Sequence, residues 1–487
     1  MQLLQGETNE GANVSEGNGT RRLTIAEFAA RSAGRADEYH RYQIDTNVTK
    51  DVQPLPNRFI VKVGKVGLAK FLIKETFQYW GKWDVIMSRP CTYGVFSGPV
   101  GGFNPRPKLC VGCLRCTIQH PEAVTIRHNP EWKAWGDTYL SPKLVETILS
   151  EATLGAVPVK GQGYRGRFGG PGWDRIWTDM SEIVRPTRDG IHGREFISTV
   201  VDIGSRPMHL ATNGDGERPR CLQLPLPILF DSPPESAQTV VMARLLAHAA
   251  EELETLAFLP LPLVREAGAA SPAVVPQLRA SELATLQPAP RMVEILDDAP
   301  AALALTDAIV CERLPFEPDW REALLASIAA GVRVFHLVAD YHGRGDGRFV
   351  RDLVMEAHAL LVEKGLRDMV TLIGSGGIAA AEHVPKAIIC GFDAVALDTP
   401  LLAALQAQPK GSVTDAATAR FRLPESLNVE WGVQRLKNLA AAWRDQLLEI
   451  MGAMGLREVR RLRGELGRAM FQRDLEREAF GGIDGYD

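Results

Sequence analysis

Short apolar runs and amphipathic segments alternate along the second half of the chain. From residue 222 onwards, runs of Val, Ile and Leu without polar alternation predict strands that are covered on both faces. The eight predicted strands are 225–230, 256–259, 273–277, 292–296, 307–311, 333–339, 369–374 and 394–398. Apolar positions with the helical period predict helices between several of them, over 235–254, 320–330, 349–364 and 382–390.

This alternation predicts an α/β fold, a (β/α)8 TIM-type barrel over residues 222–410. The third and fourth strands are weakly patterned, so an open doubly wound sheet is the alternative. C-terminal helices are predicted over 411–487, where an apolar stripe runs from Trp431 to Met454 and Gly455 suggests a turn. Several arginines between 457 and 468 alternate with glutamates there, which predicts a solvated or partner-facing helix.

Three segments precede the predicted barrel. Residues 1–50 are predicted to be a largely disordered tail, because Gly, Asn, Glu and Ser dominate its beginning and large apolar side chains are few. Residues 51–154 form a small compact unit that contains the crowded cysteines. Residues 155–221 are a connector that begins with a Gly- and Arg-rich boundary.

Composition narrows the class of protein without deciding its function. The formal net charge of the 487 residues is only −4, so neither nucleic acid nor an anionic membrane is predicted as a partner. No run of about eighteen apolar residues predicts a membrane span. The first residues lack the basic-then-apolar layout of a secretory signal, so the expected location is the cytoplasm.

Three of the seven cysteines lie within seven residues. Cys110, Cys113 and Cys116 have the spacing C-x₂-C-x₂-C, which lets three thiolates converge on one iron–sulfur cubane. His120, followed by proline, stands where a ferredoxin has the cysteine of its second cluster. The window therefore resembles one half of a bacterial ferredoxin, and it predicts a ferredoxin-like unit with one cluster.

The fourth ligand of this cluster has three candidates. Cys91 is the other cysteine of the unit and is the preferred ligand of a 4Fe-4S cluster. His120 is the second candidate, since imidazole replaces thiolate in some clusters. A 3Fe-4S cluster would need no fourth ligand. A zinc site or three unrelated buried thiols is the alternative to any cluster.

A glycine turn and a polar turn lie at the ends of the last two predicted barrel strands. Gly374, Ser375, Gly376 and Gly377 follow strand seven, and the polar pair Asp398 and Thr399 ends strand eight. In barrels of this kind, these two turns offer backbone N–H groups to a phosphate. Glycine is needed because a Cβ would hold the backbone away from the phosphate oxygens. The two turns therefore predict a bound phosphate cofactor.

Taken together, these motifs resemble the FMN-binding synthase domain of glutamate synthase, in its archaeal-type branch. The resemblance spans about residues 173–405 and rests on segments 225–232, 365–368, 374–378 and 386–395. It implies an oxidoreductase acting on CH–NH2 donors, with FMN over the top of the barrel and its phosphate near strands seven and eight. In that family electrons pass between the flavin and a cluster, and 2-iminoglutarate is reduced to glutamate.

Some elements of the family are absent from this sequence. Residues 256–265 lack the acidic, glycine-rich element that follows strand two, and residues 398–431 contain no cysteine. The expected function is an iron–sulfur flavoprotein in a larger complex, with other redox or amidotransferase subunits as partners. One alternative is a non-catalytic electron-transfer or scaffold subunit with a degenerate barrel. The other is a glutamate synthase that uses ammonia or a separate glutaminase subunit.

Overall fold

The structure is a computed structural model that describes residues 13–16, 19–22, 42–82, 91–97, 104–157, 172–178, 197–204, 220–286, 289–483 and 485. The chain divides into two units, residues 1–43 and 44–487. In the first unit, β1 (Asn13–Glu16) pairs antiparallel with β2 (Gly19–Arg22). All other elements belong to the second unit.

Eight parallel strands of the second unit close into a barrel, in the order β8-β9-β10-β11-β12-β13-β16-β17. The strands are β8 (Ile228–Phe230), β9 (Ala257–Pro260), β10 (Val274–Leu278), β11 (Met292–Ile295), β12 (Ile309–Pro315), β13 (Val334–Val338), β16 (Thr371–Ser375) and β17 (Ala394–Leu397). Each overlaps one of the eight predicted segments. The predicted TIM-type barrel is confirmed, and the open sheet is wrong.

Helices follow the strands and cover the outside of the barrel. They are α7 (Val240–Glu252), α8 (Leu261–Ala267), α9 (Ala299–Ala302), α10 (Trp320–Ala329), α11 (Val350–Glu363), α12 (His383–Cys390) and α13 (Thr399–Ala404). Every residue of β10, β11, β16 and β17 is buried. This burial on both faces explains why the strands lack polar alternation.

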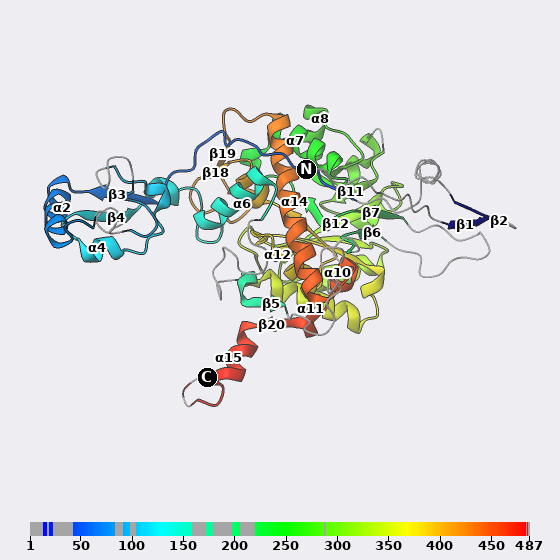
Figure 1. The fold of residues 1–487 in the computed structure, drawn as a ribbon. Coiled ribbons are helices and arrows are strands. Elements are labelled where there is room, and N and C mark those ends of the chain that lie inside the picture. Colours follow the sequence, from blue (N-terminus) through cyan, green and yellow to red (C-terminus); the bar gives the residue numbers. More distant parts are fainter. Residues whose placement is uncertain are drawn as a thin grey trace. The chain divides into compact units, whose positions relative to one another are not determined.

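The long helix α14 (Val429–Met454) lies between the barrel and α6 (Pro142–Leu154), a helix that precedes the barrel in the chain (Figure 1). It packs against α7 and against α6. Arg435 of α14 is fully buried and donates to the Ala404 carbonyl and to Asp51. Asn438 donates to the Asn47 carbonyl at 2.7 Å. Residues 44–50, which lie in the predicted disordered tail, are therefore held in place by side-chain hydrogen bonds and not by apolar burial.

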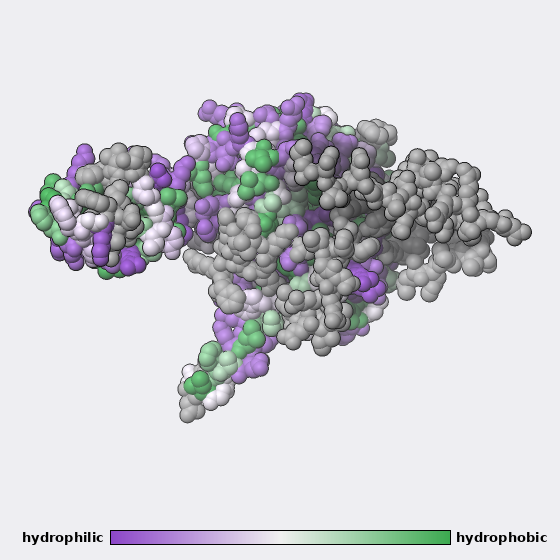
Figure 2. All heavy atoms as spheres, viewed as in Figure 1, coloured by the Kyte–Doolittle hydropathy of each residue, from purple (hydrophilic) through white to green (hydrophobic). Residues whose placement is uncertain are grey.

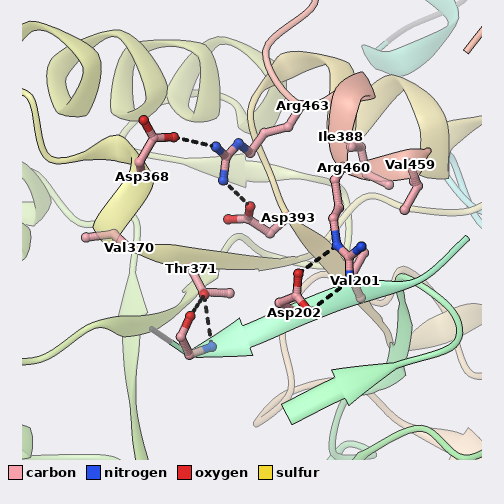
Figure 3. A pocket seen from close by; sticks show the side chains of 11 residues that line it. Val201, Asp202, Asp368, Val370, Thr371, Ile388, Asp393, Val459, Arg460 and Arg463 are labelled. Atoms are coloured by element: carbon pink, nitrogen blue, oxygen red, sulfur yellow. Dashed lines mark hydrogen bonds and ion pairs between the residues drawn. The ribbon is translucent and has the colours of Figure 1, made fainter. Parts of the chain in front are cut away.

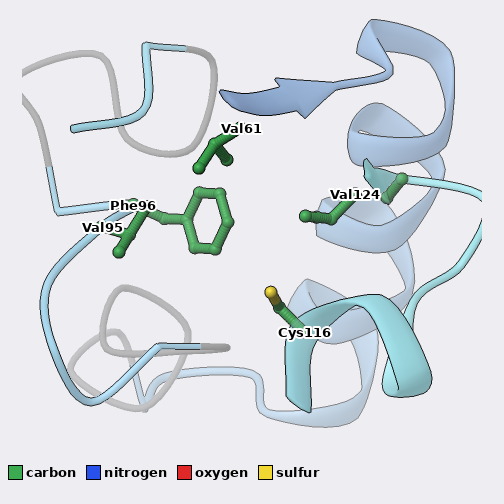
Figure 4. Close-up of a cluster of buried hydrophobic side chains, with 6 residues drawn as sticks. Val61, Val95, Phe96, Cys116 and Val124 are labelled. Atoms are coloured by element: carbon green, nitrogen blue, oxygen red, sulfur yellow. The ribbon is translucent and has the colours of Figure 1, made fainter. Parts of the chain in front are cut away.

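Residues 58–135 form a unit that we call the cysteine lobe. Its strands β3 (Phe59–Val63) and β4 (Val124–His128) pair antiparallel. Its helices are α2 (Lys65–Gln78), α4 (Arg115–Gln119) and α5 (Pro130–Lys133), and a 3-10 turn, η1, spans Pro107–Leu109. A small apolar core of Val61, Val95, Phe96, Ala123 and Val124 lies inside the lobe, and Cys116 belongs to it (Figure 4).

The connector contributes strands to two small strand pairs. β6 (Val201–Gly204) pairs with β7 (Cys221–Leu224), and β5 (Ile176–Thr178) pairs with β20 (Ala469–Phe471). The backbone N–H of Gly204 donates to Thr371 Oγ1 at 3.1 Å, where β16 begins. The β6–β7 pair therefore lies at the amino-terminal end of the barrel, opposite the end where the predicted phosphate turns are found.

The C-terminal region turns at Gly455 as predicted but is less helical beyond it than the sequence predicts. Gly455, with φ of +74°, ends α14, and the chain continues through 3-10 turns and β20 to α15 (Gln472–Phe480). Arg460 donates to Asp202, and Arg463 donates to Asp368 and Asp393. These two arginines therefore bind the rest of the fold, and they are not on a solvated helix. No helix of the described residues is long and apolar enough to cross a membrane.

Candidate cofactor sites

The cysteine loop, residues 110–116, has an unusual backbone. Gly112 has a φ of +74°, and a Cβ there would come 2.3 Å from the Phe59 ring. Leu114 has a φ of +59°, a conformation that costs a residue with a side chain about 1–3 kcal/mol and that is concentrated at functional sites. The loop therefore wraps tightly, as a loop that points several thiolates at one cluster must.

The structure brings all four predicted ligand cysteines into one neighbourhood. Cys91 and Cys110 are partly buried and pack against the same apolar core that includes Cys116, whereas Cys113 is exposed. Burial raises the pKa of the Cys110 thiol, and the nearby Cys91 and Cys113 raise it further against the opposing N–H of Gly112. Burial also raises the pKa of Cys116, with Cys110 and Cys113 adding to the effect.

The other candidate ligand, His120, lies just beyond α4 and has a different contact. Its ring lies 4.2 Å from the ring of Phe71 in α2. Within the described ranges, no three His, Cys, Asp or Glu side chains are arranged to hold a single metal ion. Sulfurs that bind a cluster are spread around several iron atoms, so they need not meet at one point as the ligands of a zinc ion do.

The last residues of β16 and the turn that follows it, residues 374–378, which we call the β16 turn, contain three of the predicted glycines in constrained positions. A Cβ on Gly374 would come 2.3 Å from the Phe392 ring, so this glycine allows close packing inside the barrel wall. Gly376 has a φ of +96°, and a Cβ there would come 2.5 Å from the Asp340 carbonyl oxygen. Gly377 has a φ of +70° and approaches the Cα of Gly343 closely. Glycine here is required by packing against the loop after β13 as well as by any phosphate.

Several polar groups of this turn have no hydrogen-bond partner among the described residues. Ser375 is 1% exposed, and its Oγ is unpaired within the described part of the chain. In the same ranges, the structure records no acceptor for the backbone N–H groups of Gly376, Gly377 and Ile378. Buried polar groups are usually paired, so unpaired ones at a predicted phosphate turn indicate room for a ligand that accepts hydrogen bonds.

A segment just after the cysteine lobe covers this turn. The Tyr139 hydroxyl donates to the Gly377 carbonyl at 2.5 Å, and the Tyr139 ring stacks on His342 at 5.5 Å. Asp137 accepts from the backbone N–H of Val413 at 3.0 Å and lies 2.8 Å from His342 Nε2. The polypeptide that leaves the cysteine lobe therefore passes directly over the predicted phosphate turn.

The end of β17 offers fewer free hydrogen-bond donors to a phosphate than the sequence predicts. Asp398 is buried, and its carboxylate accepts from the backbone N–H of Thr399 and from the Thr399 hydroxyl. Burial, with a contribution from the negative charge of Asp231, raises the pKa of Asp398 to about 7. The carboxyl group of Asp398 therefore takes hydrogen bonds that a phosphate would otherwise receive. Of the two predicted turns, the one after β16 fits a phosphate better.

A polar cluster that sequence analysis missed lies inside the barrel. Arg313 of β12 donates to both oxygens of Asp231, at 2.9 and 3.1 Å, and to Glu294 at 3.3 Å. Glu294 also accepts from Gln277 at 2.5 Å, and its other oxygen lies 2.6 Å from His336 Nδ1. We call these five residues the barrel network. Gln277, Glu294 and His336 were each visible in the sequence as a single polar residue in an apolar strand, whereas Asp231 and Arg313 lie just beyond the predicted strands 225–230 and 307–311.

The barrel network has a charged centre and an unpaired edge. Burial alone would raise the pKa of Asp231, but Arg313 and His336 lower it below its ordinary value. Glu294 and His336 are fully buried, and His336 Nε2 has no partner among the described residues. The Arg313 side chain is 19% exposed, so part of it reaches the margin of the network.

A hollow lies at the amino-terminal end of the barrel, opposite the β16 turn (Figure 3). It has a volume of about 280 Å³ and is lined by Asp202, Asp368, Asp393, Arg460 and Arg463 among others. Its arginines are already paired with its carboxylates, as the dashed lines of Figure 3 show. This end of a TIM-type barrel contributes to stability, whereas active sites lie at the other end. We therefore assign the hollow to the fold.

Comparison with known proteins identifies the relatives of this chain. A family model described as a conserved region in glutamate synthase matches residues 350–457. Those residues run from α11 through the turn after β16 and β17 into the last turns of α14 and beyond. The archaeal-type glutamate synthase (NADPH) of Dehalococcoides mccartyi is 24% identical over 436 residues, covering 74% of this chain and 86% of the relative.

The chain is a distant homologue of archaeal-type glutamate synthases. The resemblance predicted from the sequence is thereby confirmed. The archaeal glutamate synthase (NADPH) of Methanocaldococcus jannaschii is 37% identical over 114 residues, which is 22% of either chain.

Solved structures with a similar fold include the flavin-binding domain of baker's yeast flavocytochrome b2 (TM-score 0.40, 13% identity, 70% of this chain and 81% of that one). A variant of mandelate oxidase is similar to the same degree (TM-score 0.40, 15% identity, 69% and 93%). The barrel is established by its own strand order.

Proposed function

We propose that this glutamate-synthase-like chain is an oxidoreductase that acts on CH–NH2 donors, with FMN at the carboxyl-terminal end of its barrel and a 4Fe-4S cluster in its cysteine lobe. The observation that carries the proposal is the position of the glutamate synthase region: it covers the turn after β16, where Ser375 Oγ is buried and unpaired among the described residues. Redox or amidotransferase subunits would be its partners in a larger complex.

The residues of the β16 turn fit a flavin phosphate. Ser375 Oγ and the N–H groups of Gly376 and Gly377 would donate to its oxygens, as glycine turns do at this position of a barrel. Tyr139 would hold the turn in place through its bond to the Gly377 carbonyl. The flavin, when bound, supplies hydride and single-electron chemistry. Asp398 would have to be protonated beside a phosphate, and its pKa of about 7 permits this.

Four cysteine thiolates would hold the cluster: Cys91, Cys110, Cys113 and Cys116. Cys91 is preferred over His120 as the fourth ligand because it packs against the same core as Cys110 and affects the Cys110 pKa. The apolar core around Cys116 would exclude water from one side of the cluster, and its exposed side would lie near Cys113. Because the chain leaving this lobe crosses the β16 turn at Tyr139, the two cofactors would be linked by one continuous segment.

The barrel network lies inside the barrel and would set the electrostatics of a substrate site there. Arg313 and Glu294 are candidates for groups that orient a substrate or move a proton, because Arg313 is partly accessible and Glu294 contacts His336. Asp231 holds the guanidinium in position with two hydrogen bonds. Substitution of a network residue should therefore affect turnover more than flavin content.

A second function is favoured by one observation, the carboxyl group of Asp398 at the end of β17. Its oxygen already accepts hydrogen bonds from the Thr399 N–H and hydroxyl, and its negative charge would repel a phosphate above about pH 7. In a non-catalytic electron-transfer or scaffold subunit, the barrel would bind no flavin. The test is reconstitution with iron, sulfide and FMN: retained stoichiometric FMN supports the oxidoreductase, and a protein that keeps iron but never flavin supports the scaffold.

A further inference from the structure

Charge is distributed unevenly between the cysteine lobe and the rest of the chain. Residues 58–135 contain 12 Lys and Arg but only 4 Asp and Glu, a formal charge of +8. Because the whole chain has a net charge of −4, the remaining residues together have −12. The lobe is therefore a basic unit within an acidic chain, a separation that the overall composition hides.

Basic side chains flank the cysteine loop and are not neutralised. Arg106 and Lys108 stand at the start of and within η1, directly before Cys110, and Arg115 opens α4 between Cys113 and Cys116. All three are exposed, and none makes an ion pair with any residue that the structure describes. Unpaired surface cations of this kind attract an acidic partner and orient it before contact.

Apolar side chains complete the same surface. Leu109, Val111 and Leu114 belong to the cysteine loop or its border and are 41%, 48% and 45% exposed. Cys113 is exposed between them. Figure 2 shows hydrophilic and apolar residues interleaved over the lobe, and the exposed fractions assign these three to its surface. An apolar centre surrounded by charges is the usual layout of a protein–protein interface.

We propose that this surface of the cysteine lobe docks a small acidic electron-transfer protein. The inference rests on the proposed function, because that function puts in the lobe the cluster that the carrier would reduce. In the reaction one electron would leave the reduced carrier and enter the oxidised cluster, with no bond made and no proton moved. Exposure at Cys113 would bring one edge of the cluster to the contact, and the apolar side chains around it would exclude water from the interface.

Charge alone would also suit a nucleic acid, but the surface favours a protein. Binding of a nucleic acid would rest on contacts to its phosphates, and exposed aliphatic side chains next to the cations contribute nothing to such contacts. Leu109, Val111 and Leu114 instead offer apolar area at the centre of the cationic surface. A duplex DNA probe therefore serves as the competing ligand in the test.

The test measures binding of an acidic two-cluster bacterial ferredoxin to the full chain at about 0.05 M and about 0.3 M salt, over which the Debye length falls by more than half. The double variant Arg106→Glu/Lys108→Glu should bind roughly tenfold more weakly at low salt and depend less on salt. The matched control Lys364→Glu/Lys410→Glu makes the same charge change at exposed barrel positions and should bind like the wild type.

The docking proposal would be overturned by equal losses in both double variants, by binding that does not respond to salt, or by tighter binding of a DNA duplex than of the ferredoxin. Iron, sulfide and circular dichroism are measured on every preparation, so that a variant that fails to fold is recognised and replaced by Arg115→Gln. A protein that binds the ferredoxin but holds no iron would refute the proposed function and leave the docking surface supported. A protein with its cluster that binds no ferredoxin would refute the docking alone.

Discussion

Replacing Arg313 by methionine tests whether the barrel network is a real buried charge cluster. The substitution keeps much of the apolar stem but removes the guanidinium that donates to both oxygens of Asp231 and to Glu294. Asp231 is 4% exposed and Glu294 is fully buried, so two carboxylates would be left without their cation. Breaking a buried pair in this way costs about 3–5 kcal/mol of the free energy of unfolding.

The size of this loss can be checked against a surface pair in the same chain. Arg220 donates to Asp307 at 2.7 Å, but both side chains are largely exposed, so solvent screens the pair. We expect Arg220→Met to cost only a small part of what Arg313→Met costs in urea unfolding followed by tryptophan fluorescence. Arg313→Met combined with Asp231→Asn should recover part of the loss, because one of the two orphaned charges is gone.

The pH dependence gives an independent check. The pKa of Asp231 is lowered in the folded protein, so the stability it contributes is complete above its unfolded pKa of about 3.9 and is lost as the pH falls through the lower folded value. The difference between wild type and Arg313→Met should therefore shrink below about pH 4. Equal losses for Arg313→Met and Arg220→Met, or a difference that does not change in acid, would refute the reasoning.

Three further predictions concern the candidate cofactor sites. Cys110→Ser should abolish bound iron and sulfide in anaerobic preparations, whereas Cys390→Ser, a buried thiol on α12, should leave both unchanged. FMN retention should fall as the pH rises through about 7, because the carboxyl group of Asp398 then becomes charged. Asp398→Asn should remove this pH dependence. A wild-type FMN retention that is flat between pH 6 and 8 would contradict the prediction. Gly376→Ala should lower thermal stability clearly more than Gly347→Ala, since both have positive φ but only the first Cβ meets backbone, and equal melting temperatures would show that the close approach does not matter.

The sequence predicted the barrel well because its signal is local and repeated. Each strand is a short apolar run bounded by polar or glycine residues, so all eight overlapped the observed strands, including the two weak ones at β10 and β11. Those two looked weak because a proline and the polar Gln277 and Glu294 interrupt them. Gln277 and Glu294 belong to the barrel network. An inward polar residue in a strand is stabilised only by partners from other strands, and a local pattern does not show those partners.

Features that depend on contacts between distant segments were not predictable from local patterns. Residues 44–50 are mostly polar, yet they are ordered because Asn438 and Arg435 of α14, almost four hundred residues away, bind their backbone and side chains. The arginines after α14 suggested a solvated helix, but Arg463 pairs with two aspartates brought near it by the barrel. The contact of Tyr139 with Gly377 likewise has no sequence signal, because a lone tyrosine shows nothing of its partner.

We have proposed that one chain holds both an iron–sulfur cluster and a flavin, and this co-occurrence can be measured. Its most direct test is anaerobic purification, followed by assay of iron, acid-labile sulfide and acid-released flavin, with the flavin identified by chromatography. Our account predicts iron and sulfide in the ratio of a 4Fe-4S cluster together with one FMN per chain. Iron and sulfide without FMN, even after reconstitution, would contradict the assignment of the β16 turn, and the absence of all three would contradict the account as a whole.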